Sequence, residues 1–523
     1  MPRKTPFPEQ TRAARYAALG VALLVLGLRW WLVHLYGVEV PFWDQWDAEV
    51  DALLRPWQQG RLGLAALFTP HNEHYIVSTR LFSLALFSAH GGFSPRLEML
   101  IQACLPAIGA GALTLLLLRD LPRARWSPLL LIAVLAGAHP LTHENLLSGF
   151  QSAVFFAALF SLLALVVACS RGPTPLTWPR VALCLALLSA AFASLASGTL
   201  AALVVCLVWA TRAAASRSDR PAWLRRLTVA VGFSALLLVA TPHVPAHDGL
   251  RAASIGDALR AFMLSLGWPN TPFSYSSVVL LWAPLTAAIA HELAHRSFDE
   301  EAWLPTALIV FVSSLMVATA WRRGVGGMGP ALRSAESYLV AWPCAALFAL
   351  RLARRGPRAA RLAGAWLLAL VLGLGLAAYG AFDDLVESRR TRRAMRDRIV
   401  TALELEALGA DSGRRYLASG QPGVDLPYPD AARLWQILRS PGVDAALPPG
   451  LRPSPGAGSR AAPAEAGLLE QRWLAALLIL IGAALLGVGQ GPLVRAGAEG
   501  GDGAEDGEGT EDSGGAEGSE QVE

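Results

Sequence analysis

The sequence has few charged residues and almost no lysine. Only 16% of its 523 residues are charged, whereas 54% are hydrophobic, and the mean hydropathy is +0.42. These values exclude an ordinary soluble domain and indicate a polytopic membrane protein. Lys4 is the only lysine, and the arginines are scattered at the ends of apolar segments. The net charge of +4 therefore gives no reason to expect a nucleic-acid partner.

Closely spaced cysteines and a signal-peptide cleavage pattern are also absent. The five cysteines lie inside apolar runs, so we expect small core residues rather than disulfides or a zinc site. They are Cys104, Cys169, Cys184, Cys206 and Cys344. No small-residue cleavage pattern follows the first apolar run, residues 16–36. That run is long enough to span a bilayer, so we expect a retained first helix.

The fold class expected from these runs is an all-α polytopic membrane protein with about twelve transmembrane helices. The segments lie near 16–37, 96–118, 126–140, 146–169, 181–195, 198–211, 224–241, 274–294, 303–320, 338–354, 360–381 and 471–490. Arginines gather in alternate loops and at the N-terminus, which marks that face as cytoplasmic. Both termini are therefore expected to be cytoplasmic.

Residues 1–382 are expected to form the transmembrane module, with a long first outer loop at 38–95. Within that loop, residues 73–90 have a polar start and are too short to span easily. They predict an interfacial helix at the outer surface. The pair 181–195 and 198–211 predicts a short hairpin, broken near Ser197-Gly198-Thr199.

Three further regions follow the transmembrane module. Residues 383–470 begin with helical spacing of apolar residues and alternating charges, which predicts a small outer helical region. They continue as a Pro- and Gly-rich linker toward the last span at 471–490. Residues 491–523 are rich in Gly, Glu, Asp and Ser and cannot bury a core, so we expect an acidic, disordered cytoplasmic tail.

The first outer loop carries the carboxylates best placed for chemistry. Asp44 lies between Trp43 and Trp46, aromatic residues that would hold it at the depth of the membrane interface. A carboxylate there can act as a general base on an acceptor hydroxyl. The alternative is that Asp44 only caps a helix beginning at Gln45. Asp47 is the second candidate catalytic carboxylate.

The tetrapeptide His71-Asn72-Glu73-His74 is unusually polar for this chain. If it is helical, His71 and His74 share a face and can bind a divalent metal with Glu73 or Asp44. The alternative is the start of a helix, with Asn72 as cap and Glu73 in the first turn. The sequence thus leaves a divalent metal cofactor open.

Other candidate binding residues lie at the outer ends of spans. His143 and Glu144 are either functional or mark the water boundary. Four arginines suit a phosphate group; alternatively, Arg80 extends to lipid head groups, and the other three belong to a plain interfacial loop. They are Arg80 in the first outer loop and Arg322, Arg323 and Arg333 in or beside the glycine-rich loop near residues 321–337.

The motif His291-Glu292-Leu293-Ala294-His295 matches the HExxH pattern of zinc proteases. Such a protease also needs a third ligand and a dry pocket. No third-ligand motif is apparent, so an intramembrane protease remains an alternative without a complete ligand set.

Together these features resemble the GT-C class of membrane glycosyltransferases, which includes protein O-mannosyltransferases and aminoarabinose transferases. The matching elements are PFWDQWD (41–47), HNEHYIVSTRLFSLALFSAHG (71–91) and RLEMLIQACL (96–105). HENLLSGFQ (143–151), FASLASGTLA (192–201) and WRRGVGGMGPALRSAESY (321–338) resemble elements of a poorly characterised bacterial branch. The resemblance covers roughly residues 10–385, mostly as topology. Gln45 departs from it, because many relatives have a second acid there.

The resemblance implies an inverting transferase in the cytoplasmic (inner) membrane of a bacterium, working on its outer face. The donor would be a polyprenyl-phosphate-linked sugar, and the acceptor a glycan, lipid or protein. Asp44 would deprotonate the acceptor hydroxyl, and the four arginines would hold the leaving phosphate. The polyprenyl chain would lie in an apolar groove between spans.

The competing interpretation is a multi-pass transporter, or a flippase or ligase of lipid-linked glycans. Transporters often contain inverted repeats and charges near the bilayer midplane. The sequence shows no such repeat, and the candidate charged residues lie at the outer ends of the spans rather than near the midplane, which favours an enzyme.

Overall fold

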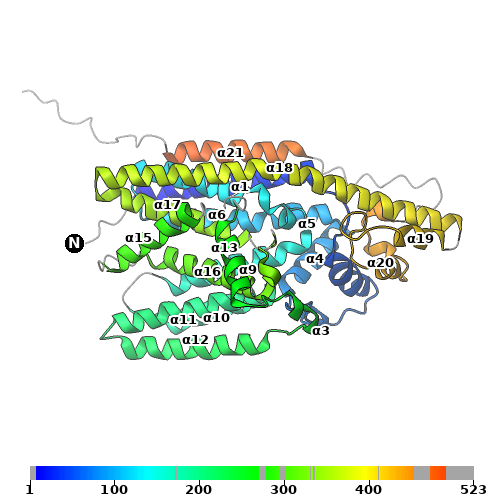
Figure 1. The fold of residues 1–523 in the computed structure, drawn as a ribbon, viewed down its shortest axis with the longest axis horizontal. Coiled ribbons are helices and arrows are strands. Elements are labelled where there is room, and N and C mark those ends of the chain that lie inside the picture. Colours follow the sequence, from blue (N-terminus) through cyan, green and yellow to red (C-terminus); the bar gives the residue numbers. More distant parts are fainter. Residues whose placement is uncertain are drawn as a thin grey trace, which may run out of the picture. The chain divides into compact units, whose positions relative to one another are not determined.

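The computed structural model of the chain is helical throughout its described part (Figure 1). It describes residues 8–170, 174–269, 278–294, 302–329, 331, 333, 336–409, 411–452 and 471–490. Within these ranges there is no strand, and only two isolated bridges occur. The predicted linker begins at Leu447, but Leu447 and Leu451 are buried, so its first residues are packed rather than flexible. The rest of it up to residue 470, the predicted tail (491–523) and His295 lie outside the described residues.

Nine helices in the described ranges are long and apolar enough to cross a membrane. They are Glu9–Tyr36, Pro95–Leu118, Arg123–Leu146, Gly149–Ala168, Gly198–Ala215, Arg220–Ala240, Trp303–Arg323, Pro357–Leu408 and Arg472–Gln490. This confirms an all-α membrane protein. The number twelve stays a prediction, because three predicted segments form shorter helices. These are Trp178–Ser194, Val278–Glu292 and Ala341–Leu352.

The chain forms its helices in the following order. The first half contains α1 (Pro8–Tyr36), η1 (Gln45–Leu54), α2 (Arg55–Gln58), α3 (Leu64–Leu67), α4 (Val77–His90), α5 (Pro95–Gln102), α6 (Cys104–Leu118), η2 (Arg123–Arg125), α7 (Trp126–Gly137), η3 (Pro140–Thr142), α8 (His143–Leu146), η4 (Gly149–Gln151), α9 (Ser152–Ala168), α10 (Trp178–Ser194), α11 (Gly198–Ala215) and α12 (Arg220–Ala240). The second half contains η5 (Pro245–Leu250), α13 (Ile255–Gly267), η7 (Val278–Trp282), α15 (Ala283–Ala294), α16 (Trp303–Arg323), η8 (Val325–Gly327), η10 (Glu336–Val340), α17 (Ala341–Leu352), η11 (Ala353–Arg355), α18 (Pro357–Leu408), α19 (Ser412–Ala418), α20 (Ala431–Leu438), η12 (Asp444–Ala446), η13 (Pro449–Leu451) and α21 (Arg472–Gln490).

The predicted break between α10 and α11 is confirmed. Helix α10 ends at Ser194, Leu195 is extended, and α11 begins at Gly198. A Cβ at Gly198 would lie 2.5 Å from the carbonyl carbon of Ala191, so only glycine permits this close return of the chain.

Helix α21 packs along α1 through glycine contacts (Figure 1). A Cβ at Gly482 would lie 2.8 Å from the backbone nitrogen of Leu24, and one at Gly20 would lie 2.8 Å from the carbonyl oxygen of Gly482. Small residues allow the backbones of membrane helices to approach this closely and gain packing contacts. These glycines thus fix how the last span lies against the first.

Gly482→Leu is expected to destabilise the protein by about 1–3 kcal/mol, the usual cost of overpacking a close contact. Gly487→Leu is the matched control, because no atom lies within 4 Å of a Cβ built on Gly487. Thermal unfolding of both variants in nanodiscs measures the effect. Equal melting temperatures for the two variants would contradict this account of the packing.

Helix α18 is 52 residues long, or about 78 Å at 1.5 Å per residue. A bilayer core needs only about 30 Å, so much of α18 extends beyond a membrane. The predicted span at 360–381 and the helical segment predicted after residue 383 form one continuous helix. It is followed in the chain by α19, which packs against it, and then by α20, which packs against α19 (Figure 1).

The C-terminal helical region and the first outer loop share one hydrophobic core. The core brings together residues far apart in sequence, including Trp46, Leu53 and Phe87 from the loop and Leu434 and Ile437 from α20. Two segments that we predicted separately therefore pack as one unit, and their contact surface positions the candidate site.

Candidate functional site

Asp44 is held by a tight turn at the start of η1. The backbone nitrogen of Gln45 donates to the Phe42 carbonyl at 3.2 Å, and that of Trp43 donates to the Pro427 carbonyl at 2.7 Å. Trp43 has φ = +51°, a conformation that costs a non-glycine residue on the order of 1–3 kcal/mol. The turn leaves the Asp44 side chain 43% exposed.

The carboxylate of Asp44 faces His71 rather than the helix it precedes. Helix η1 does begin at Gln45, but the Asp44 side chain makes no capping hydrogen bond. Its Oδ1 lies 3.4 Å from Nε2 of His71. Burial tends to raise the pKa of Asp44, but His71 and the charge of Arg333 outweigh it and lower the pKa below its usual value. Asp44 is therefore an ionised carboxylate open to solvent.

The His71–His74 segment is a turn, so both helical interpretations of it were wrong. The backbones of His71 and His74 pair in both directions, at 2.7 and 3.0 Å, and Asn72 has φ = +52°. Helix α4 begins only at Val77. A left-handed Asn is well tolerated in such a turn, which explains why this polar tetrapeptide closes on itself.

The two histidines have different environments. The His71 ring lies edge-on to Phe150 and faces Asp44. The His74 ring accepts a hydrogen bond from the backbone nitrogen of Ala196, and burial lowers the pKa of His74 to about 4. Among the residues that the structure describes, no group of three or more His, Cys, Asp or Glu is placed to hold a metal ion. The predicted metal site therefore gains no support.

The carboxylate of Glu73 lies close to three basic side chains. It lies 2.7 Å from Nη2 of Arg323, 3.6 Å from Nη2 of Arg322 and 3.4 Å from Nδ1 of His247. Both arginines remain about one-third exposed. One carboxylate cannot neutralise two guanidinium groups, so this cluster keeps a net positive charge that suits a phosphate.

Glu144 and its neighbour Asn145 anchor the loop that carries Arg333. Glu144 accepts from the Arg333 backbone nitrogen at 3.3 Å, and Asn145 donates to the Arg333 carbonyl at 2.9 Å. These bonds leave the guanidinium of Arg333 exposed, with its charge acting on Asp44. His143 is 6% exposed, in the short helix beside them.

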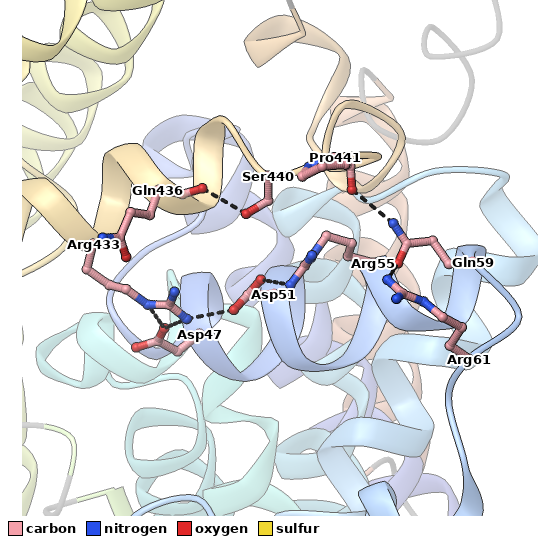
Figure 2. Close-up of polar contacts among 9 residues, drawn as sticks. All are labelled: Asp47, Asp51, Arg55, Gln59, Arg61, Arg433, Gln436, Ser440 and Pro441. Atoms are coloured by element: carbon pink, nitrogen blue, oxygen red, sulfur yellow. Dashed lines mark hydrogen bonds and ion pairs between the residues drawn. The ribbon is translucent and has the colours of Figure 1, made fainter.

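Asp47 and Asp51 connect the first loop to the C-terminal region. Figure 2 shows both carboxylates facing Arg433 of α20. The Nη2 atom of Arg433 lies 3.2 Å from Asp47 and 2.6 Å from Asp51. The Tyr428 hydroxyl also donates to Asp47, and burial together with Asp47 raises the pKa of Tyr428. Asp47 thus has a docking role that the sequence did not reveal, because its partners lie more than 380 residues away.

A buried polar network behind Asp44 was also missed. Gln45 donates through Nε2 to Glu49 at 2.8 Å and to Glu98 at 3.1 Å, and Ser83 donates to Glu98 at 2.7 Å. All four side chains are at most 2% exposed. The Gln45 amide oxygen accepts from the Phe42 backbone nitrogen, so the network also supports the Asp44 turn. A second acid in place of Gln45 could not donate these bonds.

Glu49→Gln should flatten the pH dependence of stability. Burial raises the pKa of Glu49 to about 8; the Gln45 hydrogen bond opposes this shift and the Asp44 charge adds to it. An unfolded Glu has a pKa of about 4.3. Between about pH 4.5 and 8 the folded protein therefore holds a proton that the unfolded chain has lost, so stability falls by about 1.4 kcal/mol per pH unit as pH rises.

Melting temperatures of the wild type and Glu49→Gln between pH 5 and 9 measure this effect. The melting temperature of the variant is expected to fall much less as pH rises, because a neutral amide resembles the protonated acid. Glu404→Gln, an exposed position on α18, is the control and should retain the wild-type decline. An unchanged decline in Glu49→Gln would contradict the proton held at Glu49.

The glutamate of the HExxH motif forms an ion pair with an arginine. Glu292 of α15 is 5% exposed and accepts from Nε of Arg351 in α17 at 3.0 Å. This buried ion pair joins two helices, and an ion-paired Glu292 is poorly suited to act as a zinc protease's general base.

No family model, no curated protein and no solved structure matches this chain. A functional assignment therefore depends on the geometry of its own residues.

Proposed function

We propose that this protein is an integral membrane glycosyltransferase. It would move a sugar from a polyprenyl-phosphate-linked donor to an acceptor at the outer face of a bacterial cytoplasmic membrane. The observation that carries the proposal is Asp44, an ionised, half-exposed carboxylate that caps nothing, faces His71 and is stabilised by the charge of Arg333.

The reaction requires a base and a place for a leaving phosphate. The acceptor oxygen attacks the anomeric carbon as its proton passes to Asp44, a general-base role. The bond from that carbon to the phosphate oxygen breaks, polyprenyl phosphate leaves, and the configuration inverts. Arg333, whose charge lowers the pKa of Asp44, and the Arg322–Arg323 pair at Glu73 supply positive charge for the departing phosphate.

Sugar transfer by purified protein in lipid nanodiscs tests the proposal. A panel of polyprenyl-phosphate sugars is offered with an extract of envelope glycans and lipids as acceptors, and release of free polyprenyl phosphate is followed. Nucleotide sugars serve as the contrasting donor class, and chelator or added Mg²⁺ tests metal dependence. Turnover restricted to nucleotide sugars, or no turnover with any donor, would overturn the proposal.

The second candidate is a transporter or flippase, because the apolar helices contain buried ion pairs, of which Arg29–Glu336 is the more deeply buried. Arg29 of α1 and Glu336 of η10 are 2.5 Å apart and nearly inaccessible to solvent. Ionisable groups inside a helix bundle often mark a transport pathway. Movement of a labelled lipid-linked sugar across proteoliposomes, without sugar transfer, would favour this candidate.

A further inference from the structure

A polar cavity of about 300 Å³ lies where the first outer loop meets the C-terminal region. Its polar lining includes Asp47 and Asp51 of η1, His71 of the turn, Arg80 of α4 and Arg433 of α20. That volume is at the lower end of the range for small-molecule sites. The cavity therefore suits one small polar molecule.

Arg80 is the fixed donor on one wall. It is 5% exposed, and its Nη1 donates to the carbonyls of Leu67, Thr69 and Tyr75 at 2.5–3.0 Å. Within the described part of the chain, every hydrogen bond of Arg80 leaves from Nη1. The guanidinium is thus locked in place, with Nε and Nη2 left for a ligand.

Another part of the lining carries acceptors. Asp47 and Asp51 lie side by side on η1 and share Arg433, as Figure 2 shows. The lining holds two carboxylates and two guanidiniums, and Arg55 pairs with Asp51 from outside the lining. The carboxylates disfavour a phosphate, and the guanidiniums disfavour an amine. Neutral hydroxyl groups, which both donate and accept, can bond to both parts of the lining.

We propose that this cavity binds one neutral monosaccharide unit, and that this unit belongs to the acceptor. His71 lines the cavity and lies 3.4 Å from Asp44, which is outside the lining, so an acceptor whose sugar unit binds here would reach the carboxylate past the His71 ring. The acceptor assignment rests on the proposed function, whereas the sugar binding does not. Arg80 thereby holds a sugar hydroxyl rather than the phosphate expected from the sequence.

Binding is measured by saturation-transfer NMR with the full-length protein in nanodiscs. The probes are the methyl glycosides of glucose, galactose and mannose, with glucuronate and glucosamine as charged contrasts. Ala52→Phe fills the cavity from an exposed helical position and removes no charge. Ala65→Phe is the matched control, because Ala65 is exposed in the same loop but does not line the cavity.

We expect at least one neutral glycoside to bind, with affinity at least tenfold weaker in Ala52→Phe and unchanged in Ala65→Phe. Asp51→Asn should also weaken it. The proposal is overturned if no neutral glycoside binds, if a charged sugar binds tenfold more tightly, or if the two Phe variants behave alike. Glycoside binding by a protein that transfers no sugar would retain the site and remove only the acceptor assignment.

Discussion

Asp44→Asn is expected to lower sugar transfer by about 100- to 10,000-fold, the usual contribution of a general base. The amide keeps the size of the side chain but cannot take the acceptor proton. Because the turn is held by backbone bonds and by Gln45, the variant should fold and retain donor binding. The loss should therefore appear in kcat rather than in KM for the donor.

The control for Asp44→Asn is Asp248→Asn. Asp248 lies in a different loop from Asp44 and is also a partly exposed aspartate. Its carboxylate is 3.5 Å from His243 and also pairs with Arg251. Its replacement should leave turnover unchanged. Full activity in Asp44→Asn, or equal losses in both variants, would remove Asp44 from the mechanism.

The pH profile provides a second test of Asp44. Its pKa is lowered from an already acidic value, so the carboxylate stays ionised throughout pH 5–8. Transfer that depends on Asp44 should therefore show no fall due to its protonation between pH 7 and pH 5. A loss of rate with an apparent pKa near 6 would point to a different base, such as a histidine.

Arg29→Met is expected to destabilise the protein by about 3–5 kcal/mol, because it leaves the buried Glu336 carboxylate without its partner. Arg29 also donates to the Gly137 carbonyl at 2.7 Å and lies over the Phe155 ring, so its removal loosens three contacts. Thermal unfolding in nanodiscs measures the loss. The double variant Arg29→Met/Glu336→Gln should recover a large part of it, since no buried charge remains.

Arg361→Met is the matched control for Arg29→Met. Arg361 is an exposed arginine near the start of α18, and its replacement should change stability by less than about 0.5 kcal/mol. Equal stability of the wild type and Arg29→Met would show that the buried pair contributes little. A double variant less stable than both single variants would contradict charge burial as the cause.

The spans were predictable because long apolar runs leave the backbone few alternatives to helix in a membrane. The break before Gly198 was predictable as well, since only glycine allows the approach seen there. The sequence did not predict that the span at 360–381 continues as one helix beyond residue 383. Asp383 and Asp384 indicate departure from the membrane, but they do not end a helix whose only proline, Pro357, is its first residue.

The site was predictable only in part. Asp44 and His71 were singled out by their type, yet their contact depends on a turn that the letters HNEH also allow as a helix start. The Gln45 bond to Glu98 joins residues 53 apart, and the Asp47 pairing with Arg433 joins residues 386 apart. Such contacts come from tertiary packing, which periodicity and motif spacing do not encode.

The length of α18 makes it a rigid lever between the bilayer and the sugar-sized cavity. About 27 residues, or about 40 Å, separate the end of its apolar part from its C-terminus. A tilt of about 5° within the membrane would move that far end by roughly 3.5 Å. Because Ile399 and Ala402 of α18 lie in the same hydrophobic core as η1 and α20, Arg433 would move together with Asp47 and Asp51. A change in membrane thickness would therefore reorient the whole cavity relative to the bilayer surface without changing its width.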